Sequence, residues 1–134
     1  MKALIVEDDF TNRRHMARFM KQYGDVDIAV DGAEAVDTFI HAVKKGEYYH
    51  LVLLDIMMPN MNGMEALKAI RAIEEEHQLE QAEFCKIIIM SSLNEKDDVQ
   101  LALRLGCDGY ANKPVHLDKL VEVIKKLRVP IQQQ

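Results

Sequence analysis

The sequence predicts an α/β fold of three layers, in which a parallel five-stranded sheet lies between helices. Five short apolar runs rich in branched residues alternate with segments whose apolar residues recur at helical spacing. The three middle runs are continuous, which is typical of parallel strands covered on both faces. The 134 residues suit one domain with a single core. Repeated strand–helix alternation in so short a chain favours crossover connections and a parallel sheet.

Each predicted strand is a run of apolar residues bounded by polar or charged ones. β-branched and aliphatic residues dominate these runs, and this composition suits a pleated, buried surface. In chain order the runs are Ala3–Val6, Asp27–Val30, Leu51–Leu54, Ile87–Met90 and Gly109–Ala111.

One helix is predicted after each strand, because apolar residues recur there at intervals of three and four. Gly24, Gly46 and Gly106 follow the first, second and fourth of these patterns, where a residue in the left-handed conformation would end a helix. The fourth pattern is the weakest, and the fifth has the clearest stripe. The stripes are Met16, Phe19, Met20 and Tyr23; Val36, Phe39, Ile40 and Val43; Ala66, Leu67, Ile70 and Ile73; Val99, Ala102, Leu103 and Gly106; and Leu117, Leu120, Val121, Ile124 and Leu127.

Composition and charge exclude several classes of protein. Hydrophobic residues make up 49% and charged residues 29% of the chain, a balance typical of globular proteins rather than disordered ones. With 17 basic and 22 acidic side chains the net charge is -5, so we expect no direct binding of nucleic acid. The apolar runs are far shorter than the roughly 20 residues that span a membrane, and no secretory signal precedes them. We therefore expect a cytoplasmic protein without membrane contact.

Three smaller features are predicted to be structural. Cys85 and Cys107 are too few and too far apart for a redox pair or a zinc site, so we expect two buried thiols. The acidic run Glu74–Glu76 is expected to be a solvated helix end. Arg13 and Arg14, at the start of the first helix, are also expected to be solvated.

Polar side chains follow four of the five predicted strands. Ligands of open parallel sheets bind beyond the carboxyl ends of the strands, so these side chains are candidates for one site. Any one of them alone could be a polar loop residue, but their joint placement favours a site. They are Glu7, Asp8 and Asp9 after the first strand, Asp55 after the third, Ser91 and Ser92 after the fourth, and Asn112 and Lys113 after the fifth.

Converging carboxylates repel one another unless a cation lies between them. Two or three carboxylates offer hard oxygens that suit Mg²⁺, with several waters retained and room for a substrate phosphate. Lys113 would supply a second positive charge to a phosphoryl group, and the Ser91 hydroxyl a hydrogen bond. Asp55 is then the predicted nucleophile.

The motifs at these strand ends resemble the signature of bacterial response-regulator receiver domains, in order and over nearly the whole chain. The motifs are Val6–Asp9, Leu53–Gly63, Ile89–Ser92 and Tyr110–Pro114. The resemblance implies a doubly wound (βα)5, flavodoxin-like fold with strand order 2-1-3-4-5. It also implies a receiver domain over residues 1–128, with 129–134 as a C-terminal tail or the start of a linker. The length suggests a chemotaxis-like stand-alone regulator, or a receiver excised from a larger one.

The resemblance assigns roles to residues by position. Asp55 resembles the phospho-accepting aspartate of the family, and Ser91 and Lys113 match its hydroxyl residue and its lysine. Glu7 and Asp8 resemble its acidic pair. The implied Mg²⁺ site comprises this pair, Asp55 and the backbone carbonyl of Met57. Pro114 resembles the family's cis-proline, whose peptide bond would direct Lys113 into the site, and Tyr110 resembles its switch aromatic.

The implied reaction is attack by Asp55 on a phosphohistidine of a sensor histidine kinase or a phosphotransfer protein. The chain would be a signalling switch rather than an enzyme, one that assists its own phosphorylation and dephosphorylation. Movement of Ser91 and Tyr110 would remodel the face made by the fourth helix, fifth strand and fifth helix for a downstream target protein.

Two other functions and one other role stay open. The fold could serve as a protein-binding module that needs no phosphorylation. A haloacid dehalogenase-type phosphatase is disfavoured, because Met57 stands where that family carries a second aspartate and a cap domain would not fit. Tyr110 could also be a half-exposed strand aromatic with no switching role.

Overall fold

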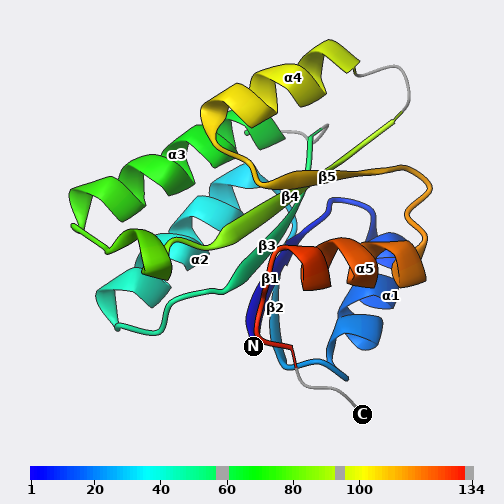
Figure 1. Cartoon of the computed structure of the whole chain (residues 1–134), viewed down its shortest axis with the longest axis horizontal. Helices are drawn as coiled ribbons and strands as arrows, with labels where there is room; N and C mark the ends of the chain where they lie inside the picture. Colours follow the sequence, from blue (N-terminus) through cyan, green and yellow to red (C-terminus); the bar gives the residue numbers. More distant parts are fainter. Residues whose placement is uncertain (57–60, 93–95, 132–134) are drawn as a thin grey trace.

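The computed structural model describes residues 1–56, 61–92 and 96–131 of the chain (Figure 1). Its strands are β1 (Lys2–Val6), β2 (Asp25–Ala29), β3 (Leu51–Asp55), β4 (Lys86–Ser91) and β5 (Gly109–Asn112). All neighbouring strands are parallel, in the order β2-β1-β3-β4-β5. The predicted α/β fold and its strand order are confirmed.

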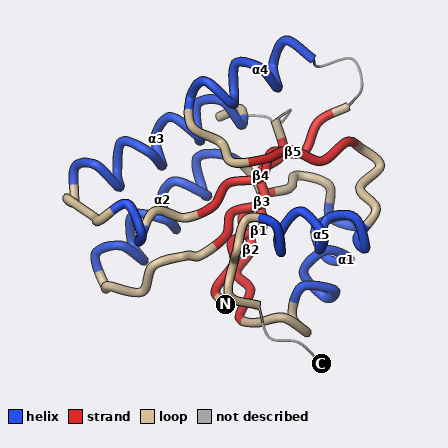
Figure 2. The backbone as a smooth tube through the Cα atoms, viewed as in Figure 1, coloured by secondary structure: helices blue, strands red, loops and turns tan. Residues whose placement is uncertain are grey.

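The helices form two layers on opposite faces of this sheet. They are α1 (Phe10–Met20), α2 (Gly32–Lys44), α3 (Gly63–Glu76), α4 (Lys96–Leu105) and α5 (Leu117–Lys126), with a short 3-10 helix, η1 (Gln81–Glu83), before β4. Figures 1 and 2 show α2, α3 and α4 on one side of the sheet and α1 and α5 on the other. In the described part of the chain, no helix has the length and apolar character needed to cross a membrane.

The core divides into two apolar clusters, one on each face of the sheet. Alternate residues of a strand point to opposite faces, so Leu4 and Val6 of β1 join the cluster under α2 and α3. Ala3 and Ile5 join the cluster under α1 and α5. The central strand β3 is buried at every position, as expected of a parallel strand covered on both sides.

Two sequence-based predictions are wrong: the burial of β2 on both faces and the apolar stripe of α4. β2 begins at Asp25 and lies at the edge of the sheet, so it is largely exposed rather than covered on both faces. Leu103 of the fourth helical stripe is 46% exposed, and the apolar face of α4 is instead carried by Val99, Ala102 and Leu105. A continuous apolar run cannot distinguish an edge strand from a central one.

A partly buried ion cluster ties α3 to β4 and to the loop before β5. Arg71 Nη1 lies 2.7 Å from Glu74 Oε1, and Nη2 lies 2.8 Å from Asp108 Oδ2. Arg71 Nε donates to the Gly106 carbonyl at 2.9 Å, and the Cys85 amide donates to Glu74 Oε2 at 2.7 Å. Glu74 is fully buried, so the prediction of a solvated acidic run is wrong at that residue. Both cysteines are buried thiols, as predicted.

Candidate functional site

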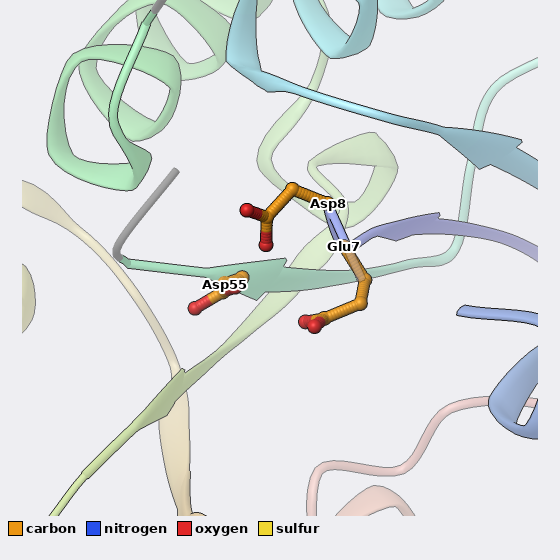
Figure 3. Close-up of side chains that lie close together, drawn as sticks. All are labelled: Glu7, Asp8 and Asp55. Carbon is orange, nitrogen blue, oxygen red and sulfur yellow. The ribbon is translucent and has the colours of Figure 1, made fainter. Parts of the chain in front are cut away.

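Three carboxylates meet where β1 and β3 end. These strands are neighbours, with Val6 paired to Leu54, so the residues that follow them in the chain, Glu7 and Asp55, lie side by side. One carboxylate oxygen each from Glu7, Asp8 and Asp55 lies within 4.8 Å of the other two. Figure 3 shows the three side chains gathered at this edge of the sheet. The cluster is therefore a direct consequence of the strand order.

Lys113 brings a positive charge to the carboxylates from the end of β5. Its Nζ donates to Asp55 Oδ1 at 2.8 Å and lies 3.8 Å from Glu7 Oε2. The Lys113 amide donates to the Ser91 carbonyl at 2.7 Å, which fixes the loop against β4. The Lys113–Pro114 peptide bond is cis.

Burial makes the charges of this site strongly interdependent. Glu7 is 2% and Asp55 1% exposed, whereas Asp8 is exposed. Burial and the negative charge of Asp55 raise the pKa of Glu7 to about 7, although Lys113 acts in the opposite direction. Burial lowers the pKa of Lys113, but its hydrogen bond to Asp55 and the surrounding negative charges outweigh this and raise it. The site therefore holds excess negative charge near neutral pH.

In chelator-treated buffer, we expect the contribution of Glu7 to the free energy of unfolding to fall as pH rises from 5 to 8. The folded-state pKa of Glu7 lies above its ordinary value, so the folded protein binds the proton more tightly than the unfolded chain. The stabilisation of the folded state by this proton is complete below the ordinary pKa of a glutamate and is lost as pH rises through about 7. The stabilisation is on the order of 1–3 kcal/mol. Urea unfolding at a series of pH values measures the dependence of the free energy of unfolding on pH. This dependence should be weaker in Glu7→Gln and unchanged in the exposed-site control Glu122→Gln. An equal pH dependence in the two variants would contradict the prediction.

Ser91 ends β4 next to the carboxylates. Met90 pairs with Asp55 across the β3–β4 ladder, and Ser91 follows it at 1% exposure. Among the residues that the structure describes, its Oγ makes no hydrogen bond. A buried hydroxyl without a partner is costly, and this makes Ser91 a candidate donor to a group that enters the site.

Tyr110 and Met57 complete the predicted site residues. Tyr110 lies on β5, paired with Ile89, and is 48% exposed. It is thus a half-exposed strand aromatic in this conformation, and this exposure is compatible with both of its interpretations. Met57, the predicted carbonyl ligand, lies outside the described residues.

Sequence reasoning missed the role of Arg13. Its Nη1 donates to the Glu7 carbonyl at 2.8 Å and to the Asp8 carbonyl at 3.3 Å, so the prediction that it is solvated is wrong. Asp9 caps α1 by accepting from the Thr11 amide, which starts the helix directly after the acidic pair. Long side chains in a helix lean towards its N-terminus, so an arginine in the first turn was a usable signal.

Glu7, Asp8 and Asp55 fit a hard divalent cation. Their oxygens are close enough to share one ion, and carboxylates in this number suit Mg²⁺, which keeps several of its waters. Such an ion would also offset the mutual repulsion that raises the pKa of Glu7. The donor set is therefore compatible with a magnesium site beside Asp55 and Lys113.

Comparison with known proteins gives a consistent family match. The family model described as the response regulator receiver domain matches residues 3–125. The chain is 36% identical over 132 residues to hybrid signal transduction histidine kinase B of Dictyostelium discoideum, covering 93% of this chain and 6% of that protein. The chain thus spans a small part of that relative's length.

Solved structures with the same fold include receivers in complexes. One is a co-crystal structure of the Saccharomyces cerevisiae histidine phosphotransfer signalling protein Ypd1 with the receiver domain of Ssk1. It matches with a TM-score of 0.80 and 28% identity, covering 96% of this chain and 91% of that one. Another is the CheX–CheY–BeF3–Mg²⁺ complex of Borrelia burgdorferi, with a TM-score of 0.78 and 26% identity, covering 96% and 90%.

Proposed function

The chain belongs to the response regulator receiver domain family, and on this premise we propose that Asp55 accepts a phosphoryl group in two-component signalling. The observation that carries the proposal is the contact of Lys113 Nζ with Asp55 Oδ1 at 2.8 Å, inside a cluster of buried acids. The donor would be a phosphohistidine of a histidine kinase or a phosphotransfer protein. The matched complex of Ypd1 with a receiver domain supports a partner of this kind.

The proposed transfer uses groups already in place. A carboxylate oxygen of Asp55 attacks the phosphorus, an O–P bond forms as the P–N bond breaks, and the electron pair returns to the imidazole. Lys113 moves its ammonium from Asp55 to a phosphoryl oxygen, where it offsets the developing charge. Ser91 donates its buried hydroxyl to another phosphoryl oxygen. Water later attacks the phosphorus of the acyl phosphate, the bond between phosphorus and the Asp55 oxygen breaks, and inorganic phosphate leaves. The chain thus acts as a switch that assists its own phosphorylation and dephosphorylation.

We propose that Glu7, Asp8 and Asp55 hold Mg²⁺, together with the carbonyl of Met57. When bound, the ion supplies positive charge that neutralises phosphoryl oxygens during transfer. Glu7 and Asp8 are suited to this role because Arg13 fixes the backbone that carries them.

We further propose that phosphorylation changes the face made by α4, β5 and α5. Ser91 and Tyr110 would move together, because they lie on the neighbouring paired strands β4 and β5, with Ser91 opposite Asn112 and Tyr110 opposite Ile89. Leu101 and Leu103 of α4 and Tyr110 of β5 are already 39%, 46% and 48% exposed. Exposed apolar side chains on these elements suit a downstream target protein that binds one of the two states.

The test is intact mass after incubation with acetyl phosphate, with Mg²⁺ or with chelator. We expect a labile gain of about 80 Da, the mass of one phosphoryl group, in the magnesium sample and none in the chelated one. A folded protein that binds Mg²⁺ but shows neither the mass gain nor a beryllofluoride adduct would contradict the proposal. That result would favour a phosphorylation-independent binding module. An adduct without a mass gain would instead indicate fast hydrolysis of the same aspartyl phosphate.

A further inference from the structure

A groove between α1 and β2 combines basic and apolar side chains. It encloses about 540 Å³ on the α1 side of the sheet edge. Figure 1 shows α1 beside β2 at this edge, on the face opposite α2. The proposed phosphorylation chemistry makes no use of this groove.

The apolar part of the groove is unusually exposed. Phe10 is 62% and Ile28 48% exposed, and both line it. Val26, two residues before Ile28 on β2, lines it as well. The acidic residues of β2 alternate with these, and Asp27 accepts a hydrogen bond from Tyr49 Oη at 2.6 Å on the α2 side. The strand therefore presents apolar side chains to the groove and keeps its carboxylates away from it.

The basic part of the groove comes from one face of α1. Arg14, Arg18 and Lys21, the last of which caps the C-terminal end of α1, are spaced by four and three residues, so they lie together on this face. None of them forms a salt bridge with any residue the structure describes, and no acidic residue lines the groove. Like charges at this spacing destabilise a helix slightly. This concentration of positive charge stands out in a chain whose net charge is -5.

We propose that this groove docks an acidic protein segment that carries apolar side chains. Its apolar residues would lie against Phe10 and Ile28, and its carboxylates would pair with Arg14 and Arg18. A helix that lies in a membrane interface buries an apolar face of its own, whereas the side chains that α1 brings to the groove are mainly basic. The basic area is small and the molecule is otherwise acidic, which disfavours a polyanion as extended as DNA. A partner here would lie next to Arg13, which also lines the groove and holds the acidic pair.

Fluorescence anisotropy with a labelled 12-residue peptide of repeating Leu-Glu-Glu tests this proposal. At low salt we expect a dissociation constant on the order of 10–100 μM. The double variant Arg14→Glu/Arg18→Glu should bind at least about 10-fold more weakly. The control Lys68→Glu/Lys125→Glu makes the same charge change at exposed positions on α3 and α5, and should bind within about 2-fold of the parent. Circular dichroism establishes that each variant is folded.

A second set of measurements tests the apolar contacts of the groove. Ile28→Thr keeps a β-branched residue in β2 but removes apolar surface, so it should weaken binding of the peptide several-fold. A peptide of repeating Ser-Glu-Glu should bind weakly to the parent and to every variant. Backbone amide shifts caused by the peptide should map to α1 and β2. Three results would overturn the proposal. The control variant could lose as much affinity as Arg14→Glu/Arg18→Glu, or the Ser-Glu-Glu peptide could bind as tightly as the Leu-Glu-Glu peptide. Anionic vesicles or duplex DNA could also bind more tightly than the peptide at the same salt.

Discussion

Replacing Arg71 by methionine is expected to lower the free energy of unfolding by about 3–5 kcal/mol. The guanidinium lies 2.7 Å from Glu74, whose side chain is completely buried. Without it a buried carboxylate loses its counterion and either stays charged in an apolar environment or takes up a proton, and both are costly. Removing one partner of a buried pair costs far more than the pair contributes when intact. The Cys85 and Gly106 carbonyls lose the hydrogen bonds they accept from Arg71 at the same time.

Urea unfolding followed by circular dichroism measures this loss. Arg104→Met is the matched control, because Arg104 is exposed on α4 and its replacement should change stability by less than about 0.5 kcal/mol. The double variant Arg71→Met/Glu74→Met removes both charges and should recover part of the loss, as replacing a whole buried pair usually does. If Arg71→Met alone lowers the free energy of unfolding by less than about 1 kcal/mol, the ion cluster around Arg71 contributes little to stability.

The fold was predictable because its signals are local. Apolar runs and helical stripes report which faces are buried, and a run such as Leu51–Leu54 needs no tertiary information to be recognised as a strand. The position of a strand within the sheet is different, because it depends on pairing between distant segments. The apolar run alone therefore predicted that β2 is covered on both faces, whereas the family resemblance, with its strand order 2-1-3-4-5, placed β2 at the edge, where it lies.

The candidate site shows the same division between local and long-range information. The acids at the ends of β1 and β3 were predictable, since parallel strands place their carboxyl ends at one edge. The partners of Arg13 and Glu74 were not predicted. Arg13 bonds to backbone carbonyls, and only its place in the first turn of α1 indicates this contact. Glu74 is buried against Arg71 and the Cys85 amide, and Cys85 follows α3 in the chain. Charged residues were assigned to solvent because that is where most of them lie.

Asp55→Asn is expected to reduce phosphoryl gain from acetyl phosphate by at least about 100-fold, because an amide is a far weaker nucleophile than a carboxylate. Asparagine has nearly the same shape, and its Oδ1 can still accept from Lys113 at the 2.8 Å contact. Asp9→Asn is the matched control: it makes the same chemical change in the neighbouring acidic run, and asparagine caps α1 as well as aspartate does. That variant should gain the full phosphoryl mass.

The stability of Asp55→Asn separates a chemical effect from misfolding. The negative charge of Asp55 helps to raise the pKa of Glu7, so its removal should bring that pKa back towards its ordinary value. In chelator at pH 8 the variant should then be at least as stable as the parent, and its stability should depend less on pH. A folded variant that still gains the phosphoryl mass would place the acceptor elsewhere. A variant less stable than the parent at pH 8 would mean that the contact with Lys113 outweighs the repulsion among the three acids.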